Sequence, residues 1–189
     1  YLETVTDREI KSGTAEIIKY GITYDVKLFN QIKDNKNLKI SDLIFRSIEI
    51  KNEVVLQDPK EQNLRKILNF GHTLGHAIES FYLESEEKEN LTHGEAIAIG
   101  MVCELYMSLK LLGFPADKLN EVKQVVLSIY NKTLLLKDNF SSIIALLKHD
   151  KKNINGQVNF VLLRDYEDFK LDCIVSEALI IESMEFYNL

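Results

Sequence analysis

The feature that most constrains the fold is a long, mostly apolar run that follows a helix-start signal. Thr92 and Glu95 have the T-x-x-E spacing of a capping box, in which each side chain bonds to the backbone N–H of the other residue. The apolar run continues to Leu112, and Gly113 predicts where the helix ends. A helix that is apolar all round must be surrounded by protein. The sequence therefore predicts a helix over about 93–112 at the centre of the core.

The rest of the chain is also mainly helical by its pattern. Apolar residues recur at helical spacing in six further stretches, at about 7–20 with Asp7 as cap, 25–32, 41–56, 115–130, 141–148 and 176–187. The segment 64–83 is helical with a bend expected near Gly71. Only towards the C-terminal end does the period change to two, which predicts a short hairpin at 157–174. We expect a mainly α, multi-helical fold with this one small β-element.

Composition narrows the class of protein. The 189 residues suit one domain, and we expect residues 1–189 to form a single helical domain cut from a longer chain that began before Tyr1. A net charge of −6 argues against a general nucleic-acid binder. Two cysteines without C-x-x-C spacing favour a reducing, cytoplasmic compartment. We find no membrane-spanning stretch and no export signal in the sequence.

Three of the four histidines lie between positions 72 and 93. His72 and His76 are four residues apart, so on a helix their rings project from one face. His93 follows in a His-Gly-Glu-Ala segment. Nearby glycines let backbones approach closely, and neutral imidazole is the commonest nitrogen ligand of zinc. The cluster indicates either a metal site or a metal ligand beside a proton-transfer group.

Other polar residues have ordinary explanations when taken one at a time. Glu16 and Lys19 have the spacing of a surface ion pair, and Lys51 alone would be a solvated lysine. Glu61, Arg65 and Asn69 are spaced as one helix face, which is usually solvated. The run 150–153, Asp-Lys-Lys-Asn, would be a charged turn before the hairpin.

The combination of these residues is more specific than its parts. In order, the pieces are Ala15-Glu16-x-x-Lys19, Lys51, Glu61-x-x-Leu64-Arg65-x-x-Leu68-Asn69-Phe70-Gly71-His72-x-x-Gly75-His76-Ala77-x-Glu79, His93-Gly94-Glu95-Ala96-x-Ala98-x-Gly100-Met101 and Asp150-Lys151-Lys152. Up to about Leu163 the chain resembles the C-terminal domain of the 3-dehydroquinate synthase family and its sugar-phosphate-cyclase relatives. One residue departs from the pattern: Asn63 stands where the family usually has glycine. Asparagine tolerates a left-handed conformation, so we expect the turn to survive.

The resemblance implies a lyase of the shikimate pathway, which serves aromatic amino acid biosynthesis. The family converts 3-deoxy-D-arabino-heptulosonate 7-phosphate to 3-dehydroquinate and phosphate, with transient use of NAD and a divalent metal, Zn²⁺ or Co²⁺. By position, Glu16, His72 and His93 match the metal ligands, and one carboxylate with two imidazoles is typical of a catalytic zinc site. His76 matches the proton-transfer histidine, and Glu61 matches a second acid/base carboxylate.

The remaining matches are groups that would hold the anionic sugar-acid phosphate. Arginine suits bidentate anion recognition and lysine suits a point-charge contact. Either member of the adjacent lysine pair at 151 and 152 could face the site. The residues matched to substrate binding are Lys19, Lys51, Arg65, Asn69, Lys151 and Lys152.

The family's NAD-binding half is a separate α/β domain that precedes this one, and this sequence has no G-x-G-x-x-G after a predicted strand. We therefore expect the N-terminal NAD-binding domain to be absent from this chain, the isolated chain to be inactive and the complete enzyme to be a homodimer. Three alternatives stay open. One is a related cyclase such as an inosose or valiolone synthase, and another is a non-catalytic metal- or partner-binding module. The third is a metal-dependent alcohol dehydrogenase, which would need no anion clamp of the kind that Arg65 and Asn69 suggest.

Overall fold

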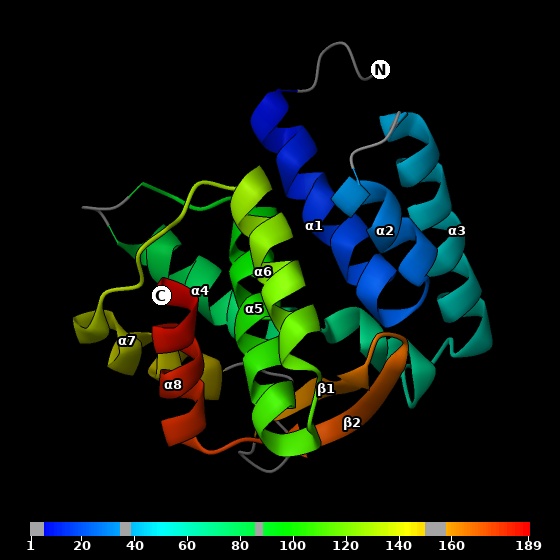
Figure 1. Ribbon diagram of the computed structural model, residues 1–189. Helices are drawn as coiled ribbons and strands as arrows, with labels where there is room; N and C mark the ends of the chain where they lie inside the picture. The colour runs from blue at the N-terminus through cyan, green and yellow to red at the C-terminus, as the bar shows by residue number, and fades with distance from the viewer. Residues whose placement is uncertain (1–5, 35–38, 86–88, 150–157) are drawn as a thin grey trace.

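The computed structural model describes residues 6–34, 39–85, 89–149 and 158–189 and shows a mainly helical fold with one hairpin (Figure 1). This confirms the predicted fold class. The elements are α1 (Asp7–Thr23), α2 (Val26–Asp34), α3 (Ile40–Gln57), the 3-10 helix η2 (Leu64–Asn69), α4 (His72–Glu84), α5 (His93–Leu112), α6 (Ala116–Ile129), the 3-10 helix η3 (Lys137–Asn139), α7 (Phe140–His149), β1 (Asn159–Asp165), β2 (Asp168–Ile174) and α8 (Glu177–Asn188).

Helix α5 is the centre of the core, as its apolar sequence predicts. It packs against α1, α4, α6, α8 and β1 (Figure 1). The predicted capping box is present, with the Thr92 N–H donating to Glu95 Oε2 at 2.7 Å. Every residue from Ala96 to Leu105 is buried. The helix ends at Gly113, whose φ of 77° costs glycine little.

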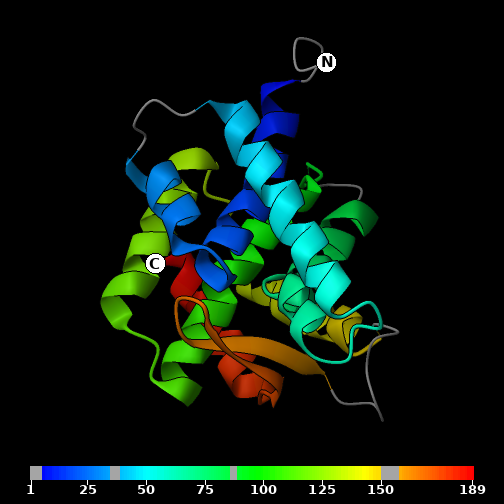
Figure 2. The same cartoon turned by 90° about the vertical axis from the view of Figure 1, so that its right-hand side faces the viewer.

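Helices α2 and α3 flank α1 on the side away from the middle of the molecule (Figure 2). The cap of α1 is Thr6 and not Asp7 as expected. Thr6 forms a capping box with Glu9, and its N–H donates to Glu9 Oε2 at 2.8 Å. Thr6 and Glu9 have the same T-x-x-E spacing as the cap of α5, so the signal was present in the sequence.

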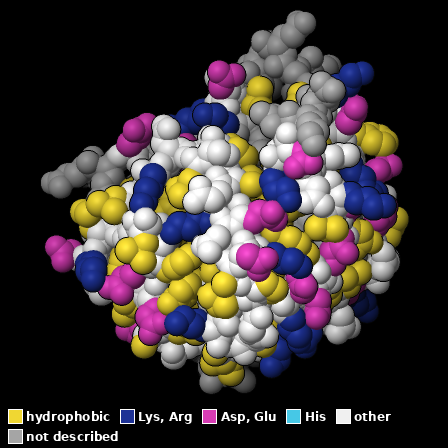
Figure 3. All heavy atoms as spheres, in the orientation of Figure 1, with side chains coloured by type: hydrophobic (Ala, Val, Ile, Leu, Met, Phe, Trp, Pro, Cys, Tyr) yellow, Lys and Arg dark blue, Asp and Glu magenta, His cyan; other side chains and the backbone are white. Residues whose placement is uncertain are grey.

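The hairpin lies against the central helix. β1 and β2 pair antiparallel, with Phe160 opposite Cys173, and β1 packs on α5. The described strands fall within the predicted range of 157–174. No helix among the described residues is long and apolar enough to cross a membrane. On the face that Figure 3 shows, acidic, basic and apolar side chains are interspersed.

The contact between α1 and α5 is closest at Gly94. A Cβ atom built at Gly94 would lie 2.1 Å from the carbonyl oxygen of Ser12, and the Gly94 N–H donates to the Ser12 hydroxyl at 2.9 Å. Any side chain here would push α1 away from α5. This explains in physical terms why glycine stands in the His-Gly-Glu-Ala segment.

Replacing Gly94 with alanine is expected to lower the free energy of unfolding by roughly 1–3 kcal/mol, because overpacking forces the backbone to move. Gly13→Ala on α1 is the matched control, since a Cβ there meets nothing within 4 Å. It should raise the free energy of unfolding by roughly 0.5–1 kcal/mol, since alanine is the better helix former. Urea titration of both variants checks the pair. Equal stability of Gly94→Ala and the unaltered chain would contradict the close contact.

Candidate metal and substrate site

Glu16 on α1 meets His72, the first residue of α4. Glu16 Oε1 lies 3.1 Å from His72 Nε2, and Glu16 Oε2 accepts a hydrogen bond from Lys19 Nζ at 2.7 Å. Burial disfavours a charged Glu16, but the hydrogen bond that His72 donates when it is protonated at acidic pH, together with the positive charge of Lys19, outweighs it. The pKa of Glu16 is therefore held well below its usual range. Glu16 is a carboxylate at neutral pH.

The hydrogen bonding of His72 leaves a lone pair facing that carboxylate. His72 Nδ1 lies 3.0 Å from the carbonyl oxygen of Phe70, which can only accept, so Nδ1 carries the proton. Burial, helped by the charge of Lys19, lowers the pKa of His72 although Glu16 opposes this. In the neutral ring Nε2 then has no proton to donate, and Glu16 Oε1 is buried without a hydrogen-bond donor among the described residues. Two electron-rich atoms facing each other at 3.1 Å suit a shared cation.

His93 is oriented by a second carboxylate. It is the first residue of α5, and its Nδ1 lies 3.1 Å from Glu79 Oε2 on α4. A carboxylate that accepts from one ring nitrogen leaves the other nitrogen as a lone-pair donor, which is the usual arrangement around metal-bound histidine. Glu79 was part of the recognised motif but was given no role from the sequence.

The three histidines converge, as their spacing predicts. The ring centroids of His72 and His76 are 5.2 Å apart, those of His72 and His93 are 5.4 Å apart, and those of His76 and His93 are 5.7 Å apart. One nitrogen from each ring lies within 4.8 Å of the other two. Glu16 joins this cluster through His72. The arrangement allows two ligand sets, either the three histidines or Glu16 with two of them.

A pocket of about 580 Å³ favours the second set. Glu16, His72 and His93 all line it, and so does Lys51 on α3. Apolar residues of α1 and α3 form most of the remaining wall. His76 is described by the structure but is not among the residues that line the pocket. The three residues matched to the metal ligands thus line one pocket together, and their assignment as ligands stays a prediction.

A second group of predicted residues lies on η2 and the turn before it. Asn69 Nδ2 donates to Glu61 Oε1 at 2.8 Å, and Arg65 Nε lies 3.8 Å from Glu61 Oε2. This group is joined to the first by Lys19, which is 2% exposed and donates to the carbonyl oxygen of Leu68 at 2.8 Å. The lysines predicted at 151 and 152 lie outside the described residues.

The turn that carries Glu61 differs from expectation. Asn63 has a φ of −139°, so it is not left-handed, and the left-handed residue is Glu61 with a φ of 53°. The carboxylate of Asp58 organises the turn by accepting from the backbone N–H groups of Gln62, Asn63 and Arg65 at 3.0, 2.7 and 3.1 Å. The position of Asp58 before proline is typical of an aspartate that bonds to the following backbone.

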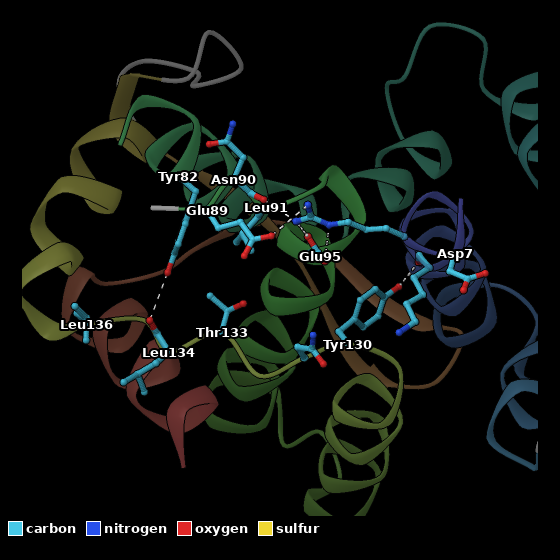
Figure 4. A pocket seen from close by; sticks show the side chains of 13 residues that line it. Asp7, Tyr82, Glu89, Asn90, Leu91, Glu95, Tyr130, Thr133, Leu134 and Leu136 are labelled. Atoms are coloured by element: carbon cyan, nitrogen blue, oxygen red, sulfur yellow. Dashed lines mark hydrogen bonds and ion pairs between the residues drawn. The ribbon is translucent and has the colours of Figure 1, made fainter. Parts of the chain in front are cut away.

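A second pocket, of about 650 Å³, lies between the start of α1, the end of α4 and the segment after α6 (Figure 4). Arg8 forms one wall, with Nη2 3.0 Å from Glu95 Oε2 and 2.7 Å from the carbonyl oxygen of Asn90. The Tyr130 hydroxyl donates to the carbonyl oxygen of Lys11 at 2.7 Å. None of the residues matched to the family's site lines this pocket.

Solved structures with a similar fold are sugar-phosphate cyclases. The 2-epi-5-epi-valiolone synthase of Streptomyces hygroscopicus subsp. jinggangensis 5008, solved with NAD⁺ and Zn²⁺ bound, has a TM-score of 0.80 and 21% identity over 97% of this chain and 52% of that chain. A 2-deoxy-scyllo-inosose synthase complexed with carbaglucose-6-phosphate, NAD⁺ and Co²⁺ has a TM-score of 0.74 and 22% identity over 96% of this chain and 53% of that chain. The chain therefore has the fold of about half of such a cyclase.

Sequence comparison narrows this class. The 3-dehydroquinate synthase of Parabacteroides distasonis is 38% identical over 193 residues, covering 100% of this chain and 54% of the relative. That of Thermoanaerobacter sp. (strain X514) is 43% identical over 172 residues, covering 85% of this chain and 46% of the relative. The chain belongs to the family described as 3-dehydroquinate synthase C-terminal, which matches residues 13–153. It spans about half the length of these relatives.

Proposed function

We propose that the chain is the metal- and substrate-binding half of a 3-dehydroquinate synthase. The complete enzyme would convert 3-deoxy-D-arabino-heptulosonate 7-phosphate to 3-dehydroquinate and phosphate, with Zn²⁺ or Co²⁺ and with NAD bound mainly by a preceding domain. The observation that carries the proposal is the pocket that Glu16, His72, His93 and Lys51 line together. Relatives named 3-dehydroquinate synthase, at 38% and 43% identity, support the substrate.

Glu16, His72 and His93 would hold the metal. One carboxylate and two imidazoles leave positions open for substrate hydroxyls, and a bound divalent ion would supply Lewis acidity that acidifies the hydroxyl to be oxidised. Metal binding needs deprotonated ligands. The lowered pKa values of Glu16 and His72 keep both residues in the required form at neutral pH. Glu79 would orient the ring of His93 by accepting a hydrogen bond from its Nδ1.

Proton transfer is assigned to His76 and Glu61. His76 lies one turn of α4 after His72, within the histidine cluster but outside the lining of the pocket. The side chains of Asn69 and Arg65 hold the carboxylate of Glu61 from either side. Arg65, Asn69, Lys51 and the lysines at 151 and 152 would bind the carboxylate, hydroxyls and phosphate of the substrate. Lys19 would help to keep Glu16 ionised, because its ammonium group contacts that carboxylate.

The proposal is tested with this chain joined to the nucleotide-binding half that the resemblance implies. Phosphate release should require the ketosugar-acid phosphate, NAD⁺ and Zn²⁺, and should stop when a chelator removes the metal. Lys51→Ala is expected to lower kcat/KM by about 10–100-fold, because it removes a hydrogen bond to a charged group worth roughly 1.5–3 kcal/mol. Lys60→Ala is the control, since the exposed Lys60 lies outside the pocket lining and its loss should change kcat/KM by less than about twofold.

The same assay separates the alternatives. Equal turnover of a sugar phosphate that lacks the carboxylate would favour a related cyclase. Oxidation of a simple alcohol without phosphate release would favour an alcohol dehydrogenase. Metal binding without turnover of any of these substrates would favour a non-catalytic metal-binding module.

A further inference from the structure

A buried carboxyl group contacts the turn that carries the histidines. Glu104 lies in the middle of α5 and is 0% exposed. Its Oε2 accepts from the Gly71 N–H at 2.7 Å, and its Oε1 accepts from the Leu74 N–H at 3.3 Å. These N–H groups belong to the N-cap and the first turn of α4, and the N-cap residue, Gly71, has no side chain that could bond to them. Glu104 therefore supplies, from another helix, the acceptor that an N-cap residue usually provides.

Burying the carboxylate of Glu104 costs free energy. Moving a carboxylate out of water costs several kcal/mol unless it is well compensated. Burial raises the pKa of Glu104, but both of its oxygens accept from backbone N–H groups, which is the bonding of the ionised form and acts in the opposite direction. Among the described residues no basic side chain pairs with Glu104, so its compensation comes from the positive end of α4.

Close packing fixes the geometry between the two helices. Gly71 has a φ of 76°, and a Cβ atom there would lie 2.4 Å from the side chain of Met101. A Cβ atom at Gly100 would lie 2.1 Å from the carbonyl oxygen of Gly71. Helix α5 therefore approaches this turn closely, one helical turn before Glu104. The residue after Gly71 is His72, so a shift of this turn would move that ring directly.

We propose that Glu104 is a positioning residue that holds the first turn of α4, and with it His72 and His76, in the orientation of the histidine cluster. It touches neither metal nor substrate. Removing its carboxylate would leave the rings present but free to move away from Glu16 and His93. The inference rests on the proposed metal centre.

The test measures Co²⁺ binding to the 189-residue chain by titration and by the visible absorption of the bound ion. Glu104→Gln keeps nearly the same shape, but its amide can accept from one N–H and turns an NH₂ group towards the other. Its Co²⁺ affinity is expected to fall by about 10–100-fold, as is typical when a group behind a metal ligand is lost. The absorption spectrum should change as well. Val126→Ala on α6, which is 1% exposed, is the control for a general loss of stability.

Three results would overturn the inference. If Glu104→Gln bound Co²⁺ as the unaltered chain does while His72→Ala lost it, the metal centre would stand and the positioning role would fail. If Val126→Ala lowered the affinity as much as Glu104→Gln at similar stability, the effect would be general. If the unaltered chain bound no Co²⁺, the proposed metal centre would fail and this inference with it. Weaker binding with an altered spectrum in Glu104→Gln alone would support it.

Discussion

Replacing His76 with alanine should leave the metal in place but slow the complete enzyme by roughly 10²–10⁴-fold, the usual loss for a proton-transfer group. Replacing His72 should remove the metal and the activity together. The reason is the geometry of the pocket, since His72 faces it beside Glu16 and His76 is not part of its wall. Metal content by mass spectrometry, together with the rate of phosphate release, separates the two effects.

Loss of the metal in His76→Ala would contradict this division of roles. His76 has a ring nitrogen within 4.8 Å of those of His72 and His93, so a site of three histidines is geometrically available. If His76→Ala lost the metal as completely as His72→Ala, His76 would be a ligand. The proton-transfer step would then need another group, and Glu61 would be the next candidate.

The 189-residue chain on its own is expected to release no phosphate from the ketosugar-acid phosphate, even with NAD⁺ and Zn²⁺ present. Hydride transfer requires the reacting atoms within about 3–3.5 Å of each other, and the usual nucleotide-binding fingerprint does not occur in this sequence. Binding of Co²⁺ by the same sample shows that the site is formed. Phosphate release by the chain alone, at the rate of a complete enzyme, would place the nucleotide site within these residues.

Supplying the proposed nucleotide-binding half as a separate protein extends this experiment. Activity should return as the concentration of the second half increases, because two separate pieces pay an entropic cost of association that a linked chain avoids. Restoration that depends on concentration would locate the missing function outside the chain. Activity that does not change with added protein would argue against the proposed division of labour.

Local signals in the sequence predicted the elements well. The capping box at Thr92 and the glycine at 113 fixed both ends of α5, because these interactions are between residues close in the sequence. The convergence of three histidines also followed from short spacing on α4 and at the start of α5. The sequence does not distinguish Thr6 from Asp7 as the cap of α1 by residue type alone, because both residues are good caps.

Long-range partners were not predictable in the same way. Glu104 is an acidic residue inside an apolar run, and nothing nearby in the sequence indicates that its acceptors meet the N–H groups of Gly71 and Leu74. The same holds for Lys19, whose burial against Leu68 depends on how α1 packs against η2. Asn63 shows a third limit. A pattern of residues does not reveal which position of a turn takes the left-handed conformation, and here it is Glu61.

The close contact between Gly94 on α5 and Ser12 on α1 also determines when the site can form during synthesis of the chain. Glu16 leaves the ribosome well before His93, and the two residues can meet only after α5 has emerged and settled against α1. Contacts between residues so far apart in sequence form slowly, because a long loop must close first. A newly made α1 therefore carries Glu16 without the two histidines proposed to bind the metal with it, and the proposed site is complete only after α5 has packed.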